Sequence, residues 1–356
     1  MLKNSENISC RQEWNMLIEN IIKREDRIPL FSFSGTAYEC GRQYAKSSLL
    51  NYPDYSYYLQ LAWDEWRNPP EKVAKLFAEK APFILDIYRG ICDVLEEDGF
   101  NSTKQDKAVE DCTSFSVCQN ELSICGQTKD TSVESLKYYT VLRMRLSDGP
   151  TILVLAYPGE VLGYGLWSNG NSLFRNDLKS SKGNGKGLSM VQYGLLALAS
   201  NGVEEMIKIA QDHGIKGAGN LLLSDNYGKS VSVEFNAGGV SFVYPEDGIL
   251  THANHAVGDN TRLYAQYPDK VEEENSIYRE EKLYGLLKKC AKNINISKAF
   301  ACLADHSAYP RGICRHIIGD DETKCTTTVI VAETHKKCLS VTKGPACLND
   351  YVTYSM

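Results

Sequence analysis

The first third of the chain carries apolar side chains at the three- and four-residue spacing of amphipathic helices. This spacing predicts helices over residues 12–24, 37–49, 55–66 and 71–95, with a short strand over 28–33. Thr36 stands directly before the second of these helices, and its hydroxyl suits the N-cap position. The first third is therefore predicted to be mostly helical.

After residue 112 the hydrophobic period changes to that of strands. Leu142, Met144 and Leu146 alternate with Arg143 and Arg145, which is typical of a strand with one exposed face. Similar runs predict strands at residues 113–117, 123–126, 139–145, 151–155, 157–167, 220–224, 230–235, 240–244, 326–332 and 337–342, and helices at 190–213, 272–289 and 297–305. This order favours two antiparallel sheets packed face to face with helices outside, an α+β architecture.

Composition narrows the class of partner. The chain has 356 residues and a formal net charge of −6, and it has no long Lys/Arg stripe, so a nucleic-acid partner is not expected. The N-terminus lacks the apolar run of a signal peptide, and no stretch approaches the roughly 18 apolar residues of a membrane span. We expect a cytoplasmic protein with a small-molecule substrate and no membrane partner.

Twelve cysteines are scattered along the chain without any Cys-x-x-Cys pair. This spacing argues against a disulfide framework and against a structural zinc site, which usually shows two close ligand pairs. The Gly-rich stretch 180–187 lacks the Gly-Lys-Ser/Thr ending of a phosphate loop. We therefore expect no cofactor and no metal.

Cys112 differs from the other cysteines in its surroundings. The polar stretch 96–110 before it is predicted to be an exposed loop, and the β-prone run 113–117 follows it. This layout is typical of an enzyme that cuts its own chain, here between Asp111 and Cys112. The new N-terminal residue would combine a nucleophilic thiol with an α-amine of pKa about 7.7–8.0 that can take the thiol proton. The alternative is a small apolar strand residue with no chemical role.

Five stretches together resemble the penicillin (isopenicillin-N) acyltransferase family, cysteine-type members of the N-terminal-nucleophile (Ntn) hydrolase superfamily. They are Gly35 to Gly41, Asp111 to Phe115, Gly126 to Asp130, Thr251 to His255 and Asp305 to His316. The resemblance implies a four-layer αββα sandwich, cleavage before Cys112 and acyl transfer through a thioester on that residue. Fragments 1–111 and 112–356 would stay associated as one domain.

The resemblance also assigns roles to three further residues. Asp130 would hold the free amine of Cys112, the amide of Asn254 would donate to the oxyanion, and Arg315 would orient Asp130 or a substrate carboxylate. Each has a structural alternative: Asp130 as a turn residue, Asn254 as the cap of a strand end, and Arg315 in a structural ion pair.

The chain departs from the family pattern at three positions. Asp111 and Gly312 stand where glycine and serine are usual, and Lys129 replaces an aromatic residue in the Gly126 to Asp130 stretch. These changes argue against penicillin as the substrate. The predicted function is hydrolysis or transfer of the acyl group of a small N-acyl amine or amino acid, with acyl-CoA as one candidate donor.

Two other functions stay open. A thiol hydrolase with a Cys-His pair would need no chain cleavage, and His252, His255, His306 and His316 are its candidate bases, although a free amine makes them dispensable. A catalytically inactive binding protein on the same fold is the non-enzymatic alternative.

Overall fold

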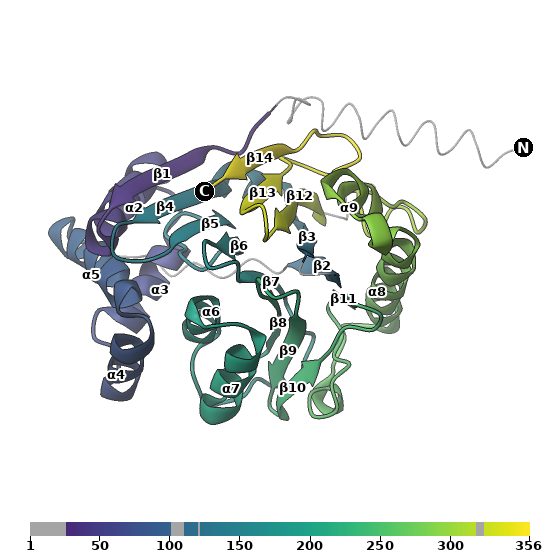
Figure 1. The fold of residues 1–356 in the computed structure, drawn as a ribbon, viewed down its shortest axis with the longest axis horizontal. Coiled ribbons are helices and arrows are strands. Elements are labelled where there is room, and N and C mark those ends of the chain that lie inside the picture. Colours follow the sequence, from purple (N-terminus) through teal and green to yellow (C-terminus); the bar gives the residue numbers. More distant parts are fainter. Residues whose placement is uncertain (1–25, 101–109, 120–121, 318–323) are drawn as a thin grey trace, which may run out of the picture.

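The computed structural model describes residues 26–100, 110–119, 122–317 and 324–356. Two β-sheets form its centre, and helices lie on the outer side of each (Figure 1). The described N-terminal part consists of β1 (Leu30–Gly35), α2 (Ala37–Asn51), α3 (Tyr57–Trp66), α4 (Glu71–Lys80) and α5 (Pro82–Glu97). The helix predicted over 12–24 lies outside the described residues.

The larger sheet has eight strands in the order β1-β4-β5-β6-β7-β8-β9-β10. After β1 these are β4 (Thr140–Leu146), β5 (Thr151–Ala156), β6 (Tyr164–Trp167), β7 (Ser172–Asn176), β8 (Gly219–Ser224), β9 (Ser230–Asn236) and β10 (Gly239–Val243). Only β1 and β4 run parallel among its paired strands. Helix α2 packs on β1 and β4, while α6 (Met190–Ala199) packs on β7 and β8 and α7 (Val203–His213) packs on β9 and β10.

The smaller sheet has six antiparallel strands in the order β11-β2-β3-β12-β13-β14. They are β11 (Ile249–His252), β2 (Asp111–Gln119), β3 (Leu122–Ser132), β12 (Lys324–Glu333), β13 (Cys338–Val341) and β14 (Val352–Ser355). Helices α8 (Lys270–Cys290) and α9 (Ile296–Leu303) cover its outer face, and its inner face contacts the larger sheet, for example β2 against β7. Three short 3₁₀ helices, η1 (Val133–Tyr138), η2 (Arg262–Tyr264) and η3 (Ala291–Asn293), lie in connections. The predicted αββα order of layers is confirmed.

Several local predictions are also confirmed. Thr36 caps α2, because its Oγ1 accepts from the Glu39 N–H at 3.3 Å and the Glu39 carboxylate accepts from the Thr36 N–H at 2.9 Å. In β4 the three apolar side chains are buried, while Arg145 is exposed. Hydrophobic period and cap chemistry therefore locate these elements correctly.

Other boundaries were predicted wrongly. The helix expected over 71–95 is two helices, because Pro82 lacks the N–H that would continue α4. The helix expected over 190–213 is divided at Gly202, whose φ of 121° lies outside the helical range. Strands β7, β11 and β14 were not predicted, since each has only four or five residues.

The two faces of the smaller sheet differ in the side chains that they bury: apolar on the outer face and partly polar on the inner face. On its outer face Phe115 and Val117 pack with Leu283 and Leu287 of α8. On its inner face Ser114 Oγ donates to Asn176 Oδ1 of β7 at 2.7 Å. Because side chains alternate along a strand, Cys112 faces the larger sheet as Ser114 does, whereas Asp111 faces the helices.

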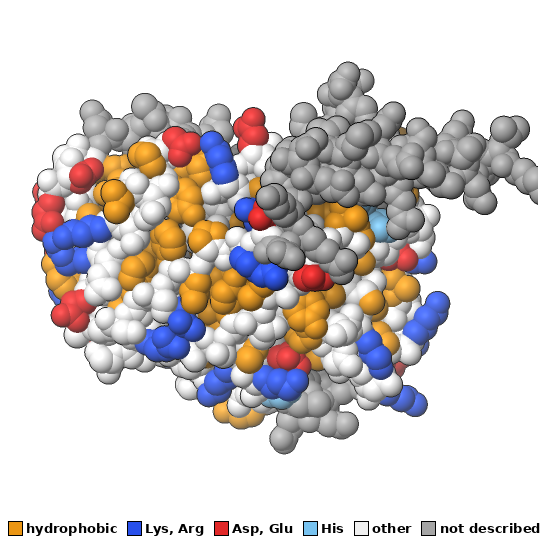
Figure 2. All heavy atoms as spheres, turned by 90° about the horizontal axis from the view of Figure 1, so that it is seen from above, with side chains coloured by type: hydrophobic (Ala, Val, Ile, Leu, Met, Phe, Trp, Pro, Cys, Tyr) orange, Lys and Arg blue, Asp and Glu red, His pale blue; other side chains and the backbone are white. Residues whose placement is uncertain are grey.

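The face seen in Figure 2 carries charges of both signs. On the described part of the face seen in Figure 2, basic and acidic side chains are interspersed, and no broad basic area stands out. The formal net charge of −6 points the same way. Among the described helices none is both long enough and apolar enough to cross a membrane.

Candidate active site

Cys112 is the second residue of β2 and is completely buried. Asp111 precedes it in the same strand, so the structure represents the uncut chain. The backbone N–H of Cys112 donates to Asn254 Oδ1 at 3.1 Å, and its carbonyl oxygen accepts from Arg279 at 2.7 Å. Both sides of this residue's backbone are thus held by side chains from distant parts of the chain.

Asn254 lies just beyond the end of β11 and is fixed by several contacts besides the one to Cys112, among them a hydrogen bond of 2.9 Å from the Lys179 N–H to its carbonyl. Its backbone N–H donates to Ser276 Oγ at 2.8 Å, and its side-chain Nδ2 donates to the carbonyl of Asp177 at 2.8 Å. Its Oδ1 also accepts from Arg279 at 2.8 Å. The side-chain amide of Asn254 is therefore held in a fixed position beside Cys112.

Arg279 is the central residue that the sequence analysis missed. Its guanidinium bonds to the Cys112 carbonyl, to Thr113 Oγ1 at 2.6 Å, to Asn254 Oδ1 and to Asn275 Oδ1 at 3.0 Å. The signal was present in α8: Ser276 and Arg279 continue the buried stripe of Leu283 and Leu287 at helical spacing. A charged residue within a buried stripe indicates a buried polar partner.

Asp111, on the N-terminal side of the scissile bond, sits in a cluster of cations. Its carboxylate lies 3.0 Å from Lys179 Nζ, 3.0 Å from Arg315 and 3.3 Å from Lys324 Nζ. Burial alone would raise the pKa of Asp111, but Lys179 and Lys324 outweigh that effect and hold it below its usual range. Asp111 is therefore a buried carboxylate whose charge is compensated by nearby cations. Residues 101–109 of the predicted exposed loop lie outside the described part of the chain.

Asp130 faces the same side of the sheet as Asp111, its direct partner in β3. Its Oδ1 accepts from Thr326 Oγ1 at 2.7 Å, and its Oδ2 has no hydrogen-bond partner among the described residues. Burial raises the pKa of Asp130 to about 6, against the attraction of Arg279 and Arg315. This carboxyl group is therefore ready to accept a hydrogen bond that the uncut chain does not supply.

Glu110 is buried on the other side of β2, which corrects its predicted place in an exposed loop. Its carboxylate accepts from Lys129 Nζ at 2.7 Å, from the Tyr164 hydroxyl at 2.9 Å and from the Tyr157 hydroxyl at 3.1 Å. Lys129 is the direct partner of Cys112 across the strands. The cation that departs from the family pattern therefore lies beside the candidate nucleophile.

The surroundings of Cys112 favour the protonated form of its thiol. Burial raises the pKa of Cys112, and the negative charge of Glu110 raises it further, whereas Lys129 acts in the opposite direction. A thiol becomes a nucleophile only after losing its proton. Reaction at this residue therefore requires a base that takes the thiol proton.

The four histidines considered as bases have other partners. His252 bonds to Glu234 at 2.7 Å, and His255 bonds to Ser276 Oγ at 3.0 Å. His306 and His316 contact each other and lie with Cys314 and Cys347 in a group of potential metal ligands. The described contacts of these histidines thus offer no Cys-His pair at Cys112.

Arg315 connects that histidine and cysteine group to the cleavage site. Its guanidinium reaches Asp111, and its backbone N–H donates at 2.8 Å to Thr326 Oγ1, the hydroxyl that donates to Asp130. The sequence-based role at Asp130 is therefore indirect in the uncut chain. Asn254 thus contacts Cys112, while Asp130 and Arg315 both lie beside Asp111; the catalytic roles of these residues stay predictions.

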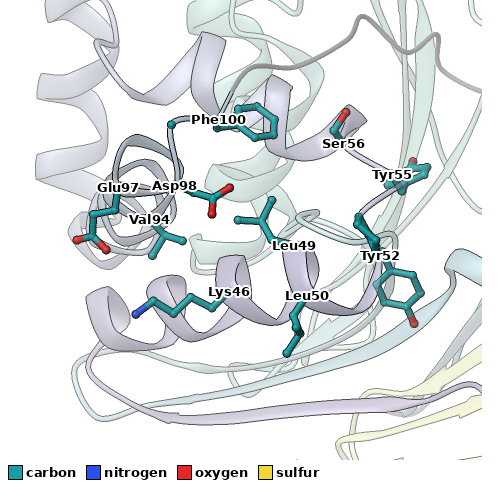
Figure 3. A pocket seen from close by; sticks show the side chains of 12 residues that line it. Lys46, Leu49, Leu50, Tyr52, Tyr55, Ser56, Val94, Glu97, Asp98 and Phe100 are labelled. Carbon is teal, nitrogen blue, oxygen red and sulfur yellow. The ribbon is translucent and has the colours of Figure 1, made fainter.

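One cavity in the described part of the chain lies away from this cluster. It has a volume of about 750 Å³ and opens between the ends of α2 and α5 (Figure 3). Leu49, Val94 and Phe100 give it apolar walls, and Lys46 and Glu97 lie on its rim. None of the described residues that line it is among the four candidate catalytic residues, so the cavity is not assigned to the reaction.

A family comparison decides the relationship of the chain. The family model of acyl-coenzyme A:6-aminopenicillanic acid acyl-transferase matches residues 120–345, well over half of the 356-residue chain. The chain belongs to this family. The predicted resemblance and the enzyme class, amide hydrolysis or acyl transfer, are thereby confirmed.

The acyl-transferase family match includes three of the four candidate catalytic residues. Asp130, Asn254 and Arg315 lie within it, whereas Cys112 lies just before it. No protein with a curated description matches the chain. The role of Cys112 therefore depends on the contacts described above.

Solved structures similar to this chain include two amide hydrolases. A mutant of conjugated bile acid hydrolase from Clostridium perfringens is 13% identical with a TM-score of 0.44, covering 68% of this chain and 97% of that one. Penicillin V acylase from Agrobacterium tumefaciens is 15% identical with a TM-score of 0.40, covering 69% of this chain and 86% of that one.

Proposed function

We propose that this acyl-transferase family member cuts itself between Asp111 and Cys112 and then uses Cys112 to hydrolyse or transfer the acyl group of a small N-acyl amine or amino acid. The observation that carries the proposal is the set of hydrogen bonds to the backbone of Cys112. The side-chain oxygen of Asn254 accepts a hydrogen bond from the Cys112 N–H. The Arg279 guanidinium donates to the Cys112 carbonyl and to the same side-chain oxygen of Asn254. These contacts place an amide and a guanidinium directly beside the residue that would act as the nucleophile.

Cleavage needs only groups of this chain and one water molecule. Cys112 Sγ attacks the carbonyl carbon of Asp111, the thiol proton moves to the Cys112 nitrogen, and the C–N bond breaks to leave a thioester. Water then releases the Asp111 carboxylate and restores the thiol. The amine formed at Cys112 lies beside Asn254 Oδ1, which already accepts the corresponding N–H.

Asp130 has a defined task once the chain is cut. Its unbonded Oδ2 lies across from Asp111, so departure of Asp111 opens the space beside a carboxylate that lacks a partner. The amine at Cys112 would donate to that oxygen, and the ammonium formed when the amine takes a proton would lower the raised pKa of Asp130. In the mature enzyme the amine would take the Cys112 proton during attack on the substrate.

The second reaction cycle repeats the first on an external amide. Cys112 Sγ attacks the acyl carbon, the amine product leaves with a proton, and water or another amine releases the acyl group from the thioester. The amide nitrogen of Asn254 carries two N–H groups, and the contact with Asp177 uses one. The other N–H is our candidate oxyanion donor.

The two fragments would remain together. Residues before the cut supply β1, which pairs with β4 over six positions, and α2 to α5, which pack over the larger sheet or on one another. Separation would expose the apolar faces of α2 and α5, so association is strongly favoured.

Intact mass of the purified chain tests the cleavage. We expect two fragments that copurify, the larger beginning at Cys112 by N-terminal sequencing, with activity appearing as they form. A single chain that nevertheless hydrolyses N-acyl amines would support a thiol hydrolase without cleavage. A single inactive chain would support the binding-protein alternative.

A further inference from the structure

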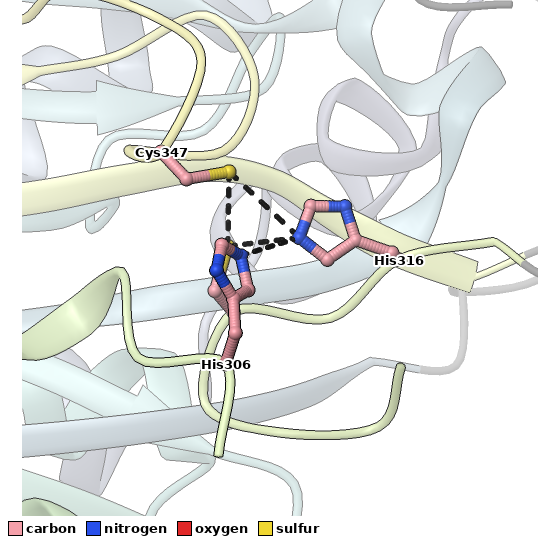
Figure 4. Close-up of side chains that lie close together, drawn as sticks. His306, His316 and Cys347 are labelled. Carbon is pink, nitrogen blue, oxygen red and sulfur yellow. Dashed lines mark hydrogen bonds between the residues drawn. The ribbon is translucent and has the colours of Figure 1, made fainter. Parts of the chain in front are cut away.

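Four side chains from three separate segments converge beside Arg315. His306 follows α9, Cys314 and His316 flank Arg315, and Cys347 lies between β13 and β14. Figure 4 shows His306, His316 and Cys347 pointing toward one another. The ligand atoms of all four residues lie within 4.8 Å of one another.

Three separations within this group are close to those of a tetrahedron around a metal. The two sulfurs are 3.6 Å apart, and His316 Nε2 lies 3.4 Å from Cys314 Sγ and 3.7 Å from Cys347 Sγ. Zinc bonds of about 2.3 Å to sulfur and 2.0–2.1 Å to nitrogen give ligand separations of about 3.8 Å for S···S and 3.5 Å for S···N. The two Nε2 atoms, 2.8 Å apart, would move outward by about half an ångström to reach ideal tetrahedral spacing.

The geometry points to a structural zinc site formed by His306, Cys314, His316 and Cys347. Two thiolates and two imidazoles favour zinc over magnesium or calcium, which prefer oxygen ligands. Four protein ligands would leave no open position, so the ion would have a structural task. It would tie the C-terminal segment at Cys347 to the loop that carries Arg315.

The sequence analysis missed this site because it looked for close ligand pairs in the Cys-x-x-Cys pattern. Only Cys314 and His316 are near each other in the sequence; the other two ligands are brought in by the fold. The proposed zinc site lies close to the residues proposed for catalysis. The loop that the ion would hold is the one from which Arg315 reaches Asp111.

Metal analysis of the full chain, purified without chelator, tests the site. We expect about one zinc ion per chain, and cobalt(II) replacement should give the visible absorption of a tetrahedral thiolate complex. A double variant, Cys314→Ser with Cys347→Ser, should lose the metal, whereas Cys338→Ser, which changes a cysteine of β13 outside the group, should retain it.

Two outcomes would overturn this proposal. One is wild-type protein without stoichiometric metal that also fails to bind cobalt(II), including protein in which Cys314 and Cys347 are joined as a disulfide. The other is metal retained by the folded double variant. Because cobalt(II) binding is measured on the wild type, poor folding of the variant does not remove the test.

A second inference comes from the buried pocket around Glu110 and rests on the proposed function. The pocket consists of the Lys129 ammonium and the hydroxyls of Tyr157 and Tyr164, all bonded to the Glu110 carboxylate. The Lys129 Nζ also lies 3.9 Å from the centre of the Tyr164 ring. Lys129 is completely buried, so the pocket is built to hold a negative charge.

Cleavage after Asp111 would free the end of the N-terminal fragment, so that Glu110 could withdraw from the pocket while the fragments stay associated. The pocket would then contain a buried cation without its anion, a costly state that another carboxylate would relieve. We infer that the acyl part of the substrate carries a carboxylate that replaces that of Glu110. The Glu110 carboxyl carbon is about seven bonds from the carbonyl carbon of Asp111, which sets the matching length of the acyl group.

Paired substrates test this inference on the cleaved enzyme. Suberoyl anilide, with a carboxylate at the matching distance, should exceed octanoyl anilide in kcat/KM by about 10- to 100-fold, as expected for a charge-assisted bond. Lys129→Met should abolish this preference. Lys137→Met, the same change at an exposed lysine, should preserve it.

The outcomes separate the substrate class from the reaction itself. Equal turnover of both anilides would overturn the carboxylate pocket while supporting the proposed hydrolysis. A cleaved enzyme that hydrolyses neither these anilides nor other N-acyl amines would contradict the proposed function. If Lys129→Met fails to fold, the charge-neutral pair Glu110→Gln with Lys129→Met provides the measurement, and a retained preference in either variant would overturn the inference.

Discussion

Cys112→Ala is expected to remain a single 39.8 kDa chain and to have no measurable amide hydrolysis. The substitution removes the only atom that, in the proposed mechanism, attacks both the Asp111 carbonyl and the substrate. The backbone contacts to Asn254 and Arg279 do not involve the thiol, so the fold should persist. Intact mass and turnover of an N-acyl amine check both results.

Cys125→Ala is the matched control. Cys125 is also completely buried in the smaller sheet, and its thiol faces Ser123 and Ser224 rather than the cleavage site. This variant should be cut and active. Cleavage or turnover by Cys112→Ala at the wild-type rate would contradict the assignment of the nucleophile.

Asn254→Ala in protein that has been cleaved is expected to lower kcat by about 10²–10³ with a smaller change in KM. An oxyanion donor acts mainly in the transition state, and loss of one such donor has this effect. Arg279 retains its bonds to the Cys112 carbonyl and to Thr113, so its charge is not left without partners. Steady-state kinetics at saturating substrate measure the change.

Asn171→Ala provides the comparison for this prediction. Asn171 is another buried asparagine, and its amide donates to carbonyl groups at the end of α6 and just after it, remote from β2. Its loss should lower stability with little effect on kcat. A kcat of Asn254→Ala within a few-fold of wild type would show that the oxyanion donor lies elsewhere.

The layers of the fold could be predicted because hydrophobic period is a local property. The alternation in β4 and the cap at Thr36 are each visible within a few residues of sequence. Short strands such as β11 and β14 could not be predicted, because four residues show too little periodicity and their pairing partners are distant in the sequence. The parallel pairing of β1 with β4 is likewise a tertiary feature, since helices α2 to α5 separate the two strands.

The candidate residues that could be named from the sequence are those that stand in family motifs. Cys112, Asp130, Asn254 and Arg315 each stand in a recognisable stretch, and the fold gathers them. Predicting the parts played by Arg279, Glu110 and the proposed zinc ligands would have required knowing which residues face one another in the fold. Whether Arg279 reaches the Cys112 carbonyl depends on how α8 packs on β2, and no local pattern encodes that packing.

Because the edge strand β1 lies before the proposed cut, the cut and the uncut protein would refold differently. Before cleavage, β1 and the helices that follow it reach the larger sheet as parts of one molecule, so folding does not depend on concentration. After the proposed cleavage the same contacts would join two polypeptides, and refolding would require their encounter in solution. Heat or denaturant would then act on a mature enzyme whose apparent stability falls on dilution and whose activity, once lost, returns slowly.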